Sequence, residues 1–335
     1  MPLRRGGFWV LEESTAGTAE AAPSGGTLAD VMHYLSLAWS VDGESHEREV
    51  QRGDWHGAKR VASCGRVARA TLETEVKASS AAGTAPEIGK LLKGAGFSEV
   101  VTPATSVVYA LGTDPLVSTA LYGLTVFAES GPASATHAGQ RNEMHGARVG
   151  NVKFSWKGGT SGAPVRVSCA LAGIHHIPID IATGTDTDSY YDAGTPLACF
   201  ASASPLSIHG YAAILREWEL TLGLVVVPRP SGAAGAADFG HKGPFWLAMG
   251  GAHRQKFVFE VTSEAVFAAW AKAHAATAGV TQLVFEAGSR KLTFDCAQVD
   301  FDNPVIRDDS LLLYEYSGNV SYADGGNDVV KLTFV

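Results

Sequence analysis

The sequence has few cysteines, no run of basic residues and no hydrophobic segment of membrane-spanning length. Its four cysteines (Cys64, Cys169, Cys199 and Cys296) are far apart and form no CxxC pair, so we expect reduced, buried thiols. The most apolar run, residues 220–228, is about half the length needed to cross a bilayer. No apolar stretch long enough for a secretory signal precedes Glu12, which predicts a cytosolic product.

Charged side chains are also scarce, at 18% of the residues, and acidic ones are in excess. Lysine and arginine number 26 against 34 for aspartate and glutamate, which gives a formal net charge of −8. Because tight nucleic-acid binding depends on cationic groups that neutralise phosphates, this balance argues against a protein that grips DNA or RNA.

Motifs for catalysis or metal binding are missing as well. His175 and His176 lie in a strand-like run, where adjacent side chains point to opposite faces, and no third ligand stands at a recognised spacing. Residues 300–303 lack the glycine and glutamate of an EF-hand, and the glycines of 156–162 lack the GxxxxGK[ST] pattern. No GxSxG motif occurs. We therefore predict no catalytic, cofactor-binding or metal-binding residue, and a protein that is not an enzyme.

The dominant pattern is the alternation of apolar and polar residues, which is typical of strands with one wet face. In residues 71–77, Glu73 and Glu75 fall on the opposite side from the apolar residues. Residues 152–156 and 165–171 alternate around a glycine-rich loop, which predicts a long β-hairpin. The same pattern recurs in 255–261, 281–296, 311–322 and 329–335.

Two segments have the spacing of an amphipathic helix. The first starts at Thr84, with Glu87 at capping-box distance, and ends at Gly94 and Gly96; its apolar stripe is Ile88, Leu91, Leu92 and Ala95. The second covers 263–279 and ends at Gly279; its stripe is Phe267, Trp270, Ala271 and His274.

A length of 335 residues favours two domains, and the order of elements is repeated in the two halves. In each half an alternating strand leads into a helix and then into further strands. The polar, turn-rich segment 182–206 lies between them and places a boundary near residue 204. We predict a mainly β protein with two tandem β-sandwich or barrel domains, 1–204 and 205–335, each flanked by one helix.

Several stretches resemble the major tail tube proteins of long-tailed, siphovirus-like bacteriophages. The run GRVARATLETEVKASSAAGTAPEIGKLLKGAGFSEVVTPATSVVYAL (65–111) is similar to their N-terminal part, in which an alternating strand leads through GTAPEIG to a Tyr-bearing strand. The charged run 40–73 and the hairpin 144–174 keep the order found in that family, and CAQVDFDNPVIRDDSLLLYEY (296–316) resembles its closing segment.

The resemblance implies a structural virion protein whose sheet joins those of its neighbours, forming stacked rings around a channel for DNA ejection. Two tandem domains in one chain would give a homotrimer with pseudo-sixfold symmetry. The expected partners are other copies of the chain, a tape measure protein, a tail terminator and tail-tip proteins, with no membrane involved. DNA would pass without specific binding, and assembly would take place in the host bacterial cytoplasm before the subunit resides in the virion tail.

A channel should not attract DNA, so acidic residues on the wet strand faces are our candidates for its lining: Glu73, Glu75, Glu217, Glu219 and Glu260. Any exposed strand face also carries charge for solubility, so these residues could equally face outward. Three segments are expected to be loops that reach neighbouring rings: 129–148, 182–197 and 229–243. The N-terminal 26 residues are a further candidate contact arm.

Two other functions remain open. Another tail or secretion-tube component would share the fold, although a second tandem domain argues against it. A carbohydrate-binding or other β-sandwich binding module is suggested by seven tryptophans and nine tyrosines, which could form sugar platforms. Most of these aromatic residues, however, alternate with polar ones as core positions do.

Overall fold

The computed structural model describes the following residues: 8–15, 17–20, 32–48, 60–77, 79, 81–111, 122–130, 139–158, 163–181, 197, 206–208, 211–229, 241, 243–260, 270, 279–308, 312–321 and 329–335. They are mainly β-strand. The strands of the first half are β1 (Phe8–Glu12), β2 (Ser36–Arg48), β3 (Arg60–Glu75), β4 (Phe97–Thr102), β5 (Ser106–Leu111), β6 (Leu124–Ser130), β7 (Gly139–Lys157) and β8 (Arg166–Ile181). Those of the second half are β9 (Leu206–Ile208), β10 (Tyr211–Thr221), β11 (Leu224–Val227), β12 (Trp246–Met249), β13 (His253–Glu260), β14 (Gly279–Ala287), β15 (Arg290–Phe301), β16 (Val305–Asp308), β17 (Leu312–Ser321) and β18 (Val330–Phe334).

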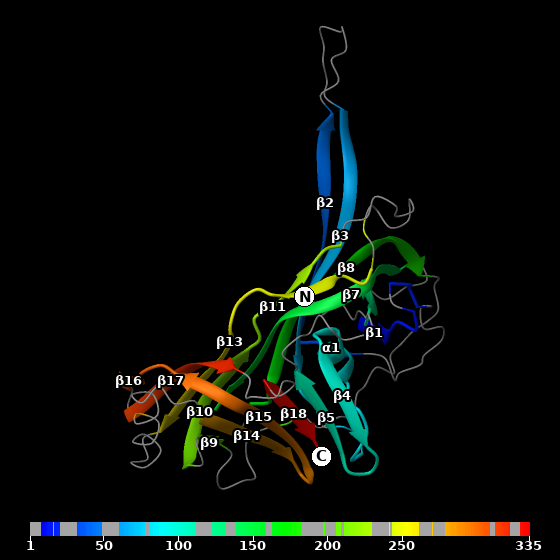
Figure 1. Cartoon of the computed structure of the whole chain (residues 1–335). Coiled ribbons are helices and arrows are strands. Elements are labelled where there is room, and N and C mark those ends of the chain that lie inside the picture. The colour runs from blue at the N-terminus through cyan, green and yellow to red at the C-terminus, as the bar shows by residue number, and fades with distance from the viewer. Residues whose placement is uncertain are drawn as a thin grey trace.

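Sixteen of these strands belong to one hydrogen-bonded sheet (Figure 1). Its main order is β2-β3-β8-β7-β10-β13-β17-β15-β18-β5-β4, and every pairing is antiparallel. Strands β11 and β12 form a separate two-stranded sheet. The β2–β3 hairpin extends well beyond the rest of the fold.

In the second half the sheet closes on itself. β10 pairs with β13, β13 with β17, and β17 with β15; β15 pairs with β14, which returns to β10 through the short strand β9. The two halves also share hydrogen bonds, because β7 pairs with β10 and the C-terminal strand β18 lies between β15 and β5. The sheet therefore crosses the boundary predicted near residue 204, and the division into two domains stays a prediction.

The core lies between this sheet and the strands that fold over it. Trp156, Trp218, Phe257 and Tyr316 lie side by side on β7, β10, β13 and β17, and all are buried. Above them, Phe294 of β15 lies 4.6 Å from Trp218, centroid to centroid. An antiparallel sheet covered on one side only should alternate apolar and polar residues, and this explains the pattern in the sequence.

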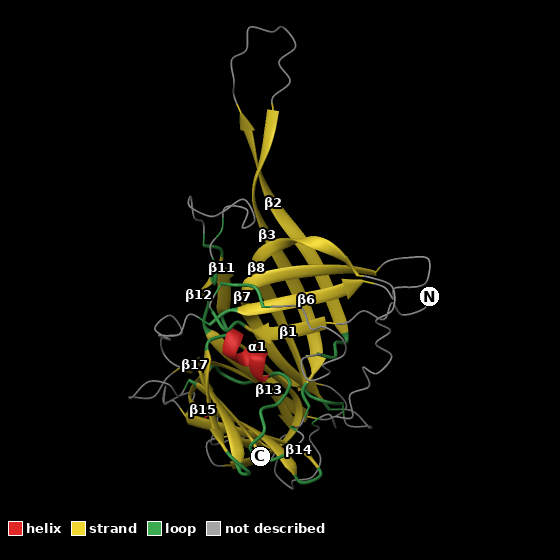
Figure 2. Ribbon diagram, turned by 90° about the vertical axis from the view of Figure 1, so that its right-hand side faces the viewer, coloured by secondary structure: helices red, strands yellow, loops and turns green. Residues whose placement is uncertain are grey.

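The one helix with bounds in the described residues, α1 (Gly89–Gly94), lies against this fold (Figure 2). The predicted stripe of Ile88, Leu91, Leu92 and Ala95 is buried, which confirms that part of the prediction. The predicted start at Thr84 is wrong: Ile88 is the N-cap and no side chain caps the helix. Glu87 does not close a capping box, because its carboxylate accepts a hydrogen bond from the His33 backbone N–H at 2.8 Å.

Several other predictions can be compared with the structure. Strands β3, β7, β8, β13, β14, β15, β17 and β18 occupy the segments whose alternation predicted them, and Cys169 and Cys296 are buried. The predicted loop at 129–148 is wrong, because β6 continues to Ser130 and β7 begins at Gly139. The N-terminal arm also contains a strand, β1, whose Phe8 and Trp9 are buried.

Some predictions fall on residues that the structure does not describe. Of the second predicted helix, 263–279, only Trp270, which is helical, and Gly279, which begins β14, are described. Most of the proposed contact loops at 182–197 and 229–243 also lie outside the described residues, as do the side chains of Cys64 and Cys199. Gly279 was expected to end a helix, and the structure places it at the start of a strand.

Candidate functional surface

The most extended polar feature is the side of the sheet that faces away from the core. We name it the polar face; it is formed by β2, β3, β8, β7, β10, β13 and β17. Because these strands are paired in register, residues of distant segments form rows across it. One row is Ser36, Glu73, Ser168, Lys153, Thr221, Arg254 and Asn319. The next is Glu75, Arg166, Ser155, Glu219, Lys256 and Ser317.

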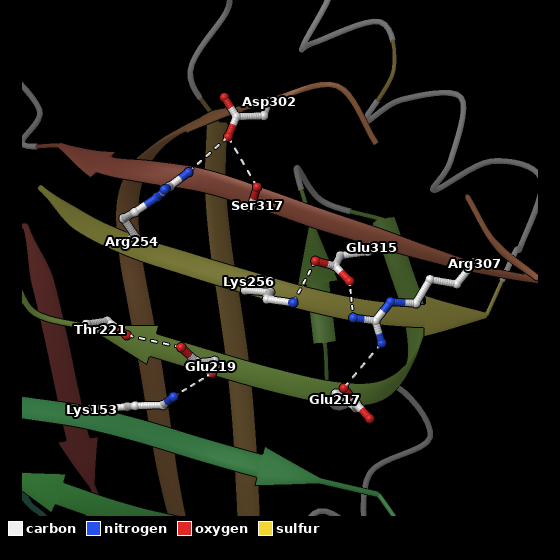
Figure 3. Close-up of polar contacts among 10 residues, drawn as sticks. All are labelled: Lys153, Glu217, Glu219, Thr221, Arg254, Lys256, Asp302, Arg307, Glu315 and Ser317. Carbon is white, nitrogen blue, oxygen red and sulfur yellow. Dashed lines mark hydrogen bonds and ion pairs between the residues drawn. The ribbon is translucent and has the colours of Figure 1, made fainter. Parts of the chain in front are cut away.

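Ion pairs connect neighbouring strands along the polar face. Lys153 of β7 lies 2.8 Å from Glu219 of β10, and Lys157 lies 2.9 Å from Glu217. Lys256 of β13 lies 2.6 Å from Glu315 of β17 (Figure 3). Arg307 of β16 contacts both Glu315 and Glu217, the latter at 3.7 Å. Cationic and anionic groups thus alternate across β7, β10, β13 and β17.

The same arrangement continues toward both edges of the sheet. Arg166 of β8 lies 3.4 Å from Glu73 of β3, and Arg69 of β3 contacts Asp42 of β2. At the other side, Arg254 lies 3.2 Å from Asp302, which also accepts a hydrogen bond from the Ser317 hydroxyl at 3.2 Å (Figure 3). Acidic residues of the polar face include Asp42, Glu73, Glu75, Glu217, Glu219, Glu260 and Glu315, and Asp300 and Asp302 border it at β15. Basic residues of the polar face include Arg69, Lys153, Lys157, Arg166, Arg216, Arg254 and Lys256, and Arg307 borders it on β16.

All five sequence-predicted acidic candidates lie on this face. Glu73, Glu217 and Glu219 are paired as described above, Glu260 contacts Arg216, and Glu75 lies directly opposite Arg166 in the register. Sequence reasoning missed the cationic partners. The signal was available, because Lys153, Lys157 and Lys256 occupy the polar positions of their own alternating strands.

Electrostatics at Glu315 illustrate how the pairs act. Burial alone would raise the pKa of this carboxyl, but hydrogen bonds and charge from Lys256 and Arg307 hold the pKa below its ordinary value. The group therefore stays ionised beside its two cations. A hollow of about 530 Å³ on the polar face is lined by acidic and basic groups alike, including Glu73, Lys157 and Arg166. Such mixed charge gives no preference for an anionic or a cationic ligand.

Titratable groups elsewhere join elements of the fold. Lys93 of α1 lies 2.5 Å from Glu12 of β1 and 3.0 Å from Glu99 of β4, which accepts a hydrogen bond from the Tyr109 hydroxyl. His175 is buried and His176 half-exposed, as expected of adjacent strand residues. Within the residues that the structure describes, no group of three or more His, Cys, Asp or Glu side chains could hold a metal ion.

At one end of the polar face, the described parts of the connection between β10 and β13, residues 222–229 and 243–252, fold back over the sheet. We name the two-stranded sheet β11–β12 in this connection the flap. Its Val226, with Phe245, packs on Val67 of β3 and on Ala172 and Ile174 of β8. Gly146 at the β7 bulge makes this close approach possible, because a Cβ there would lie 2.7 Å from the Gly243 Cα.

No protein-family model matches this chain, and no curated protein resembles it in sequence. None of the helical residues described here forms a helix long and apolar enough to span a membrane. The interpretation of the polar face therefore depends on its own geometry.

Proposed function

We propose that this chain is the major subunit of a bacteriophage tail tube, a structural protein that stacks in rings around a channel for DNA. The observation that carries the proposal is the polar face: one charge-balanced sheet surface that spans both halves of the chain, with the main core behind it. A subunit that contributes a wall to a channel needs this division between a wet side and a packed side. No catalytic, cofactor or metal site enters the proposal.

The edges of the sheet support ring formation. β2 is the last strand at one end of the sheet's main order, which ends at β4, and β16, paired only with β17 among the described strands, is an outer strand beside β17. Ile306 on β16 is 57% exposed, and Val41 on β2 is 41% exposed. Unpaired edges template pairing with another chain, and joining two different edges of identical subunits closes a ring. In this proposal β2 of one copy pairs beside β16 of the next.

The repeated order of strands supports a trimer with pseudo-sixfold symmetry. The first half contributes β2-β3-β8-β7 to the sheet, and the second half contributes β10-β13-β17-β15. In the first half β2 and β3 are followed by β8 and then by β7, which precedes β8 in the sequence. In the second half β10 and β13 are followed by β17 and then by β15, which precedes β17 in the sequence. Three chains would then present six similar sets of strands, as the tandem-domain hypothesis requires.

The charge balance of the polar face suits a surface along which DNA slides. Attraction of a polyanion grows with the number of phosphates that cations neutralise, and here those cations are already paired with carboxylates. We therefore propose a lining with nearly compensated charge, in place of the purely acidic lining that the five glutamates suggested. Tape measure, terminator and tail-tip proteins remain the proposed partners, and the virion tail the proposed location.

The alternative of a carbohydrate-binding module is less well supported. Sugar platforms need exposed aromatic rings, whereas Trp9, Trp156, Trp218, Tyr109 and Tyr316 are all buried. These side chains form the core. Trp246 and Trp270 are the exposed tryptophans among the described residues.

Electron microscopy and mass photometry of the purified chain test the proposal. We expect rings with a central hole and the mass of three subunits, together with stacks of such rings. Ile306→Lys places a charge on the outer strand β16 and should abolish rings. Val280→Lys is the matched control: Val280 is equally exposed, at 55%, but lies on β14, which is paired on both sides. A wild-type chain that stays monomeric at all concentrations would refute the tube.

A further inference from the structure

The flap is joined to the rest of the fold in a way that suits a moving lid. Gly223 comes directly before β11, and Gly250 and Gly251 come directly after β12. The backbone N–H groups of Gly250 and Gly251 both donate to the Gly223 carbonyl, at 2.8 and 3.2 Å. A side chain on Gly223 would collide with the Gly251 backbone, so the two ends of the flap lie close together there. Lids commonly turn about a few such residues at the ends of their strands.

The flap covers an apolar area of the polar face. We name this area the apolar island: Val67 of β3 with Ala172 and Ile174 of β8, which stand on the same side of these strands as the charged rows and are all buried. Val226 of the flap and Phe245 beside it pack on the island. Among the described residues this cluster is separate from the main core and comprises four buried side chains. A contact of this size can open locally while the sheet beneath it stays folded.

A single residue of β7 holds the flap in place. The Phe245 backbone N–H donates a hydrogen bond to the Gly146 carbonyl at 2.9 Å. Gly146 lies in a bulge of β7 with a φ of 58°, a left-handed conformation that favours glycine. The Gly243 backbone approaches the same point, because its Cα lies 2.7 Å from where a Gly146 Cβ would stand. The position of the flap therefore depends on the conformation of the β7 bulge.

Glu13 fixes that conformation from the N-terminal segment. Its carboxylate accepts hydrogen bonds from the Gly146 and Gly17 backbone N–H groups, both at 2.5 Å, and from the Thr125 hydroxyl at 3.2 Å. Gly17 also packs against Gly243, since a Cβ on Gly17 would collide with the Gly243 carbonyl. The carboxylate is thus the common partner of the N-terminal segment and of the β7 bulge.

We propose that the flap is a lid over the apolar island and that Glu13 is its latch, a positioning residue that acts through Gly146. With the carboxylate in place, Gly146 presents its carbonyl to Phe245 and the lid is shut. Without it the bulge relaxes, the hydrogen bond to Phe245 is lost, and the flap turns about its glycine ends. The N-terminal segment thereby controls whether the apolar island is covered. This inference does not depend on the proposed tube function.

Hydrogen–deuterium exchange of the full chain, followed by mass spectrometry at neutral pH, tests the latch. Glu13→Gln keeps the size of the side chain but turns one carboxylate oxygen into an N–H₂ donor, so it can accept from only one of the two glycine N–H groups. The matched control is Glu12→Gln, because Glu12 is the adjacent residue and pairs with Lys93 of α1 at 2.5 Å.

A second variant acts on the same contact and leaves Glu13 unchanged. Gly17→Ala places a methyl group against the Gly243 carbonyl and so displaces the N-terminal segment from the flap. Its control is Gly288→Ala, because Gly288 also has a positive φ but has nothing within 4 Å of its Cβ position. This variant keeps the test decisive even where Glu13→Gln fails to fold.

For both Glu13→Gln and Gly17→Ala we expect about tenfold faster exchange in peptides that cover 245–249, the effect of one lost hydrogen bond on a local opening. Exchange in β13 and β17 should stay as in the wild type, and both controls should match the wild type in the flap. Unchanged flap exchange in both variants, or an equal rise in β13 and β17, would overturn the lid. Faster flap exchange in Gly17→Ala alone would overturn the role of Glu13 as the latch.

Discussion

Two tryptophans in the same aromatic cluster provide a sharp test of the core. Trp156 and Trp218 are both buried, and both lie within 6.2 Å of the Phe285 ring, centroid to centroid. The Trp156 Nε1 donates a hydrogen bond to the Ala163 carbonyl at 2.8 Å. The Trp218 Nε1 is buried with no hydrogen-bond partner among the described residues. Replacing each with phenylalanine therefore removes the same atoms from opposite hydrogen-bonding situations.

The size of the difference follows from this contrast. Both substitutions lose similar apolar volume, so their cavity costs are comparable. Trp156→Phe also breaks a hydrogen bond with a net value of about 1 kcal/mol, whereas Trp218→Phe removes a buried, unpaired donor that costs about 1 to 3 kcal/mol. We expect the unfolding free energy of Trp156→Phe to be lower than that of Trp218→Phe by about 2 to 4 kcal/mol.

Urea unfolding followed by far-UV circular dichroism measures this difference without depending on tryptophan fluorescence. With a slope of about 3 kcal/mol per molar urea, the two midpoints should differ by about 0.7 to 1.3 M. Equal midpoints, or a lower midpoint for Trp218→Phe, would refute the arrangement of the cluster. Equal slopes for the two variants would show that they unfold to the same extent.

Two further predictions concern the backbone and the pH dependence of stability. Gly146 and Gly288 both have positive φ, but a Cβ meets the Gly243 backbone at Gly146 and nothing within 4 Å at Gly288. In thermal unfolding, Gly288→Ala should lower the free energy of unfolding by about 1 kcal/mol, and Gly146→Ala should lower it clearly more. Equal losses of stability in the two variants would contradict the close packing of Gly243 on Gly146. Burial raises the pKa of Glu13 above its ordinary 4.5 against hydrogen bonds from Gly146 and Gly17, so the folded chain holds this proton more tightly than the unfolded chain. The contribution of this group to stability is therefore greatest at low pH and is lost as the pH rises from about 4.5. Glu13→Gln should gain stability relative to wild type between about pH 4 and 7. A difference in unfolding free energy between the two chains that stays the same at every pH would contradict this prediction.

Local patterns predicted the strands because burial on one side of a sheet leaves a mark every second residue. Leu72, Thr74 and Val76 are buried while Glu73 and Glu75 are not, as alternation alone required. β1 was missed because its sequence, FWVLE, is short and does not alternate. The helix α1 was predicted too long because Glu87 bonds the backbone of His33, 54 residues away, and this partner cannot be seen from spacing.

The candidate surface was predictable in part for the same reason. Each glutamate could be assigned to a wet strand face, but its partner comes from a strand distant in sequence: Arg166 lies 93 residues after Glu73. Which cation lies opposite which acid depends on strand order and register. Neither can be read from one strand alone, and β7 in particular shifts register at three bulges.

The compensated polar face also follows from what a closed ring would demand of a sheet. Closing the sheet around an axis brings the same charges of several copies toward one another, so an uncompensated acidic face would repel itself before any DNA entered. Pairing Glu219 with Lys153 and Glu315 with Lys256 on adjacent strands removes that repulsion within each copy. It also favours one register between the strands, because a shift of one residue would turn the charged side chains of one strand toward the core. The acidic pattern seen in the sequence is thus one half of a pairing whose other half stabilises the sheet that carries it.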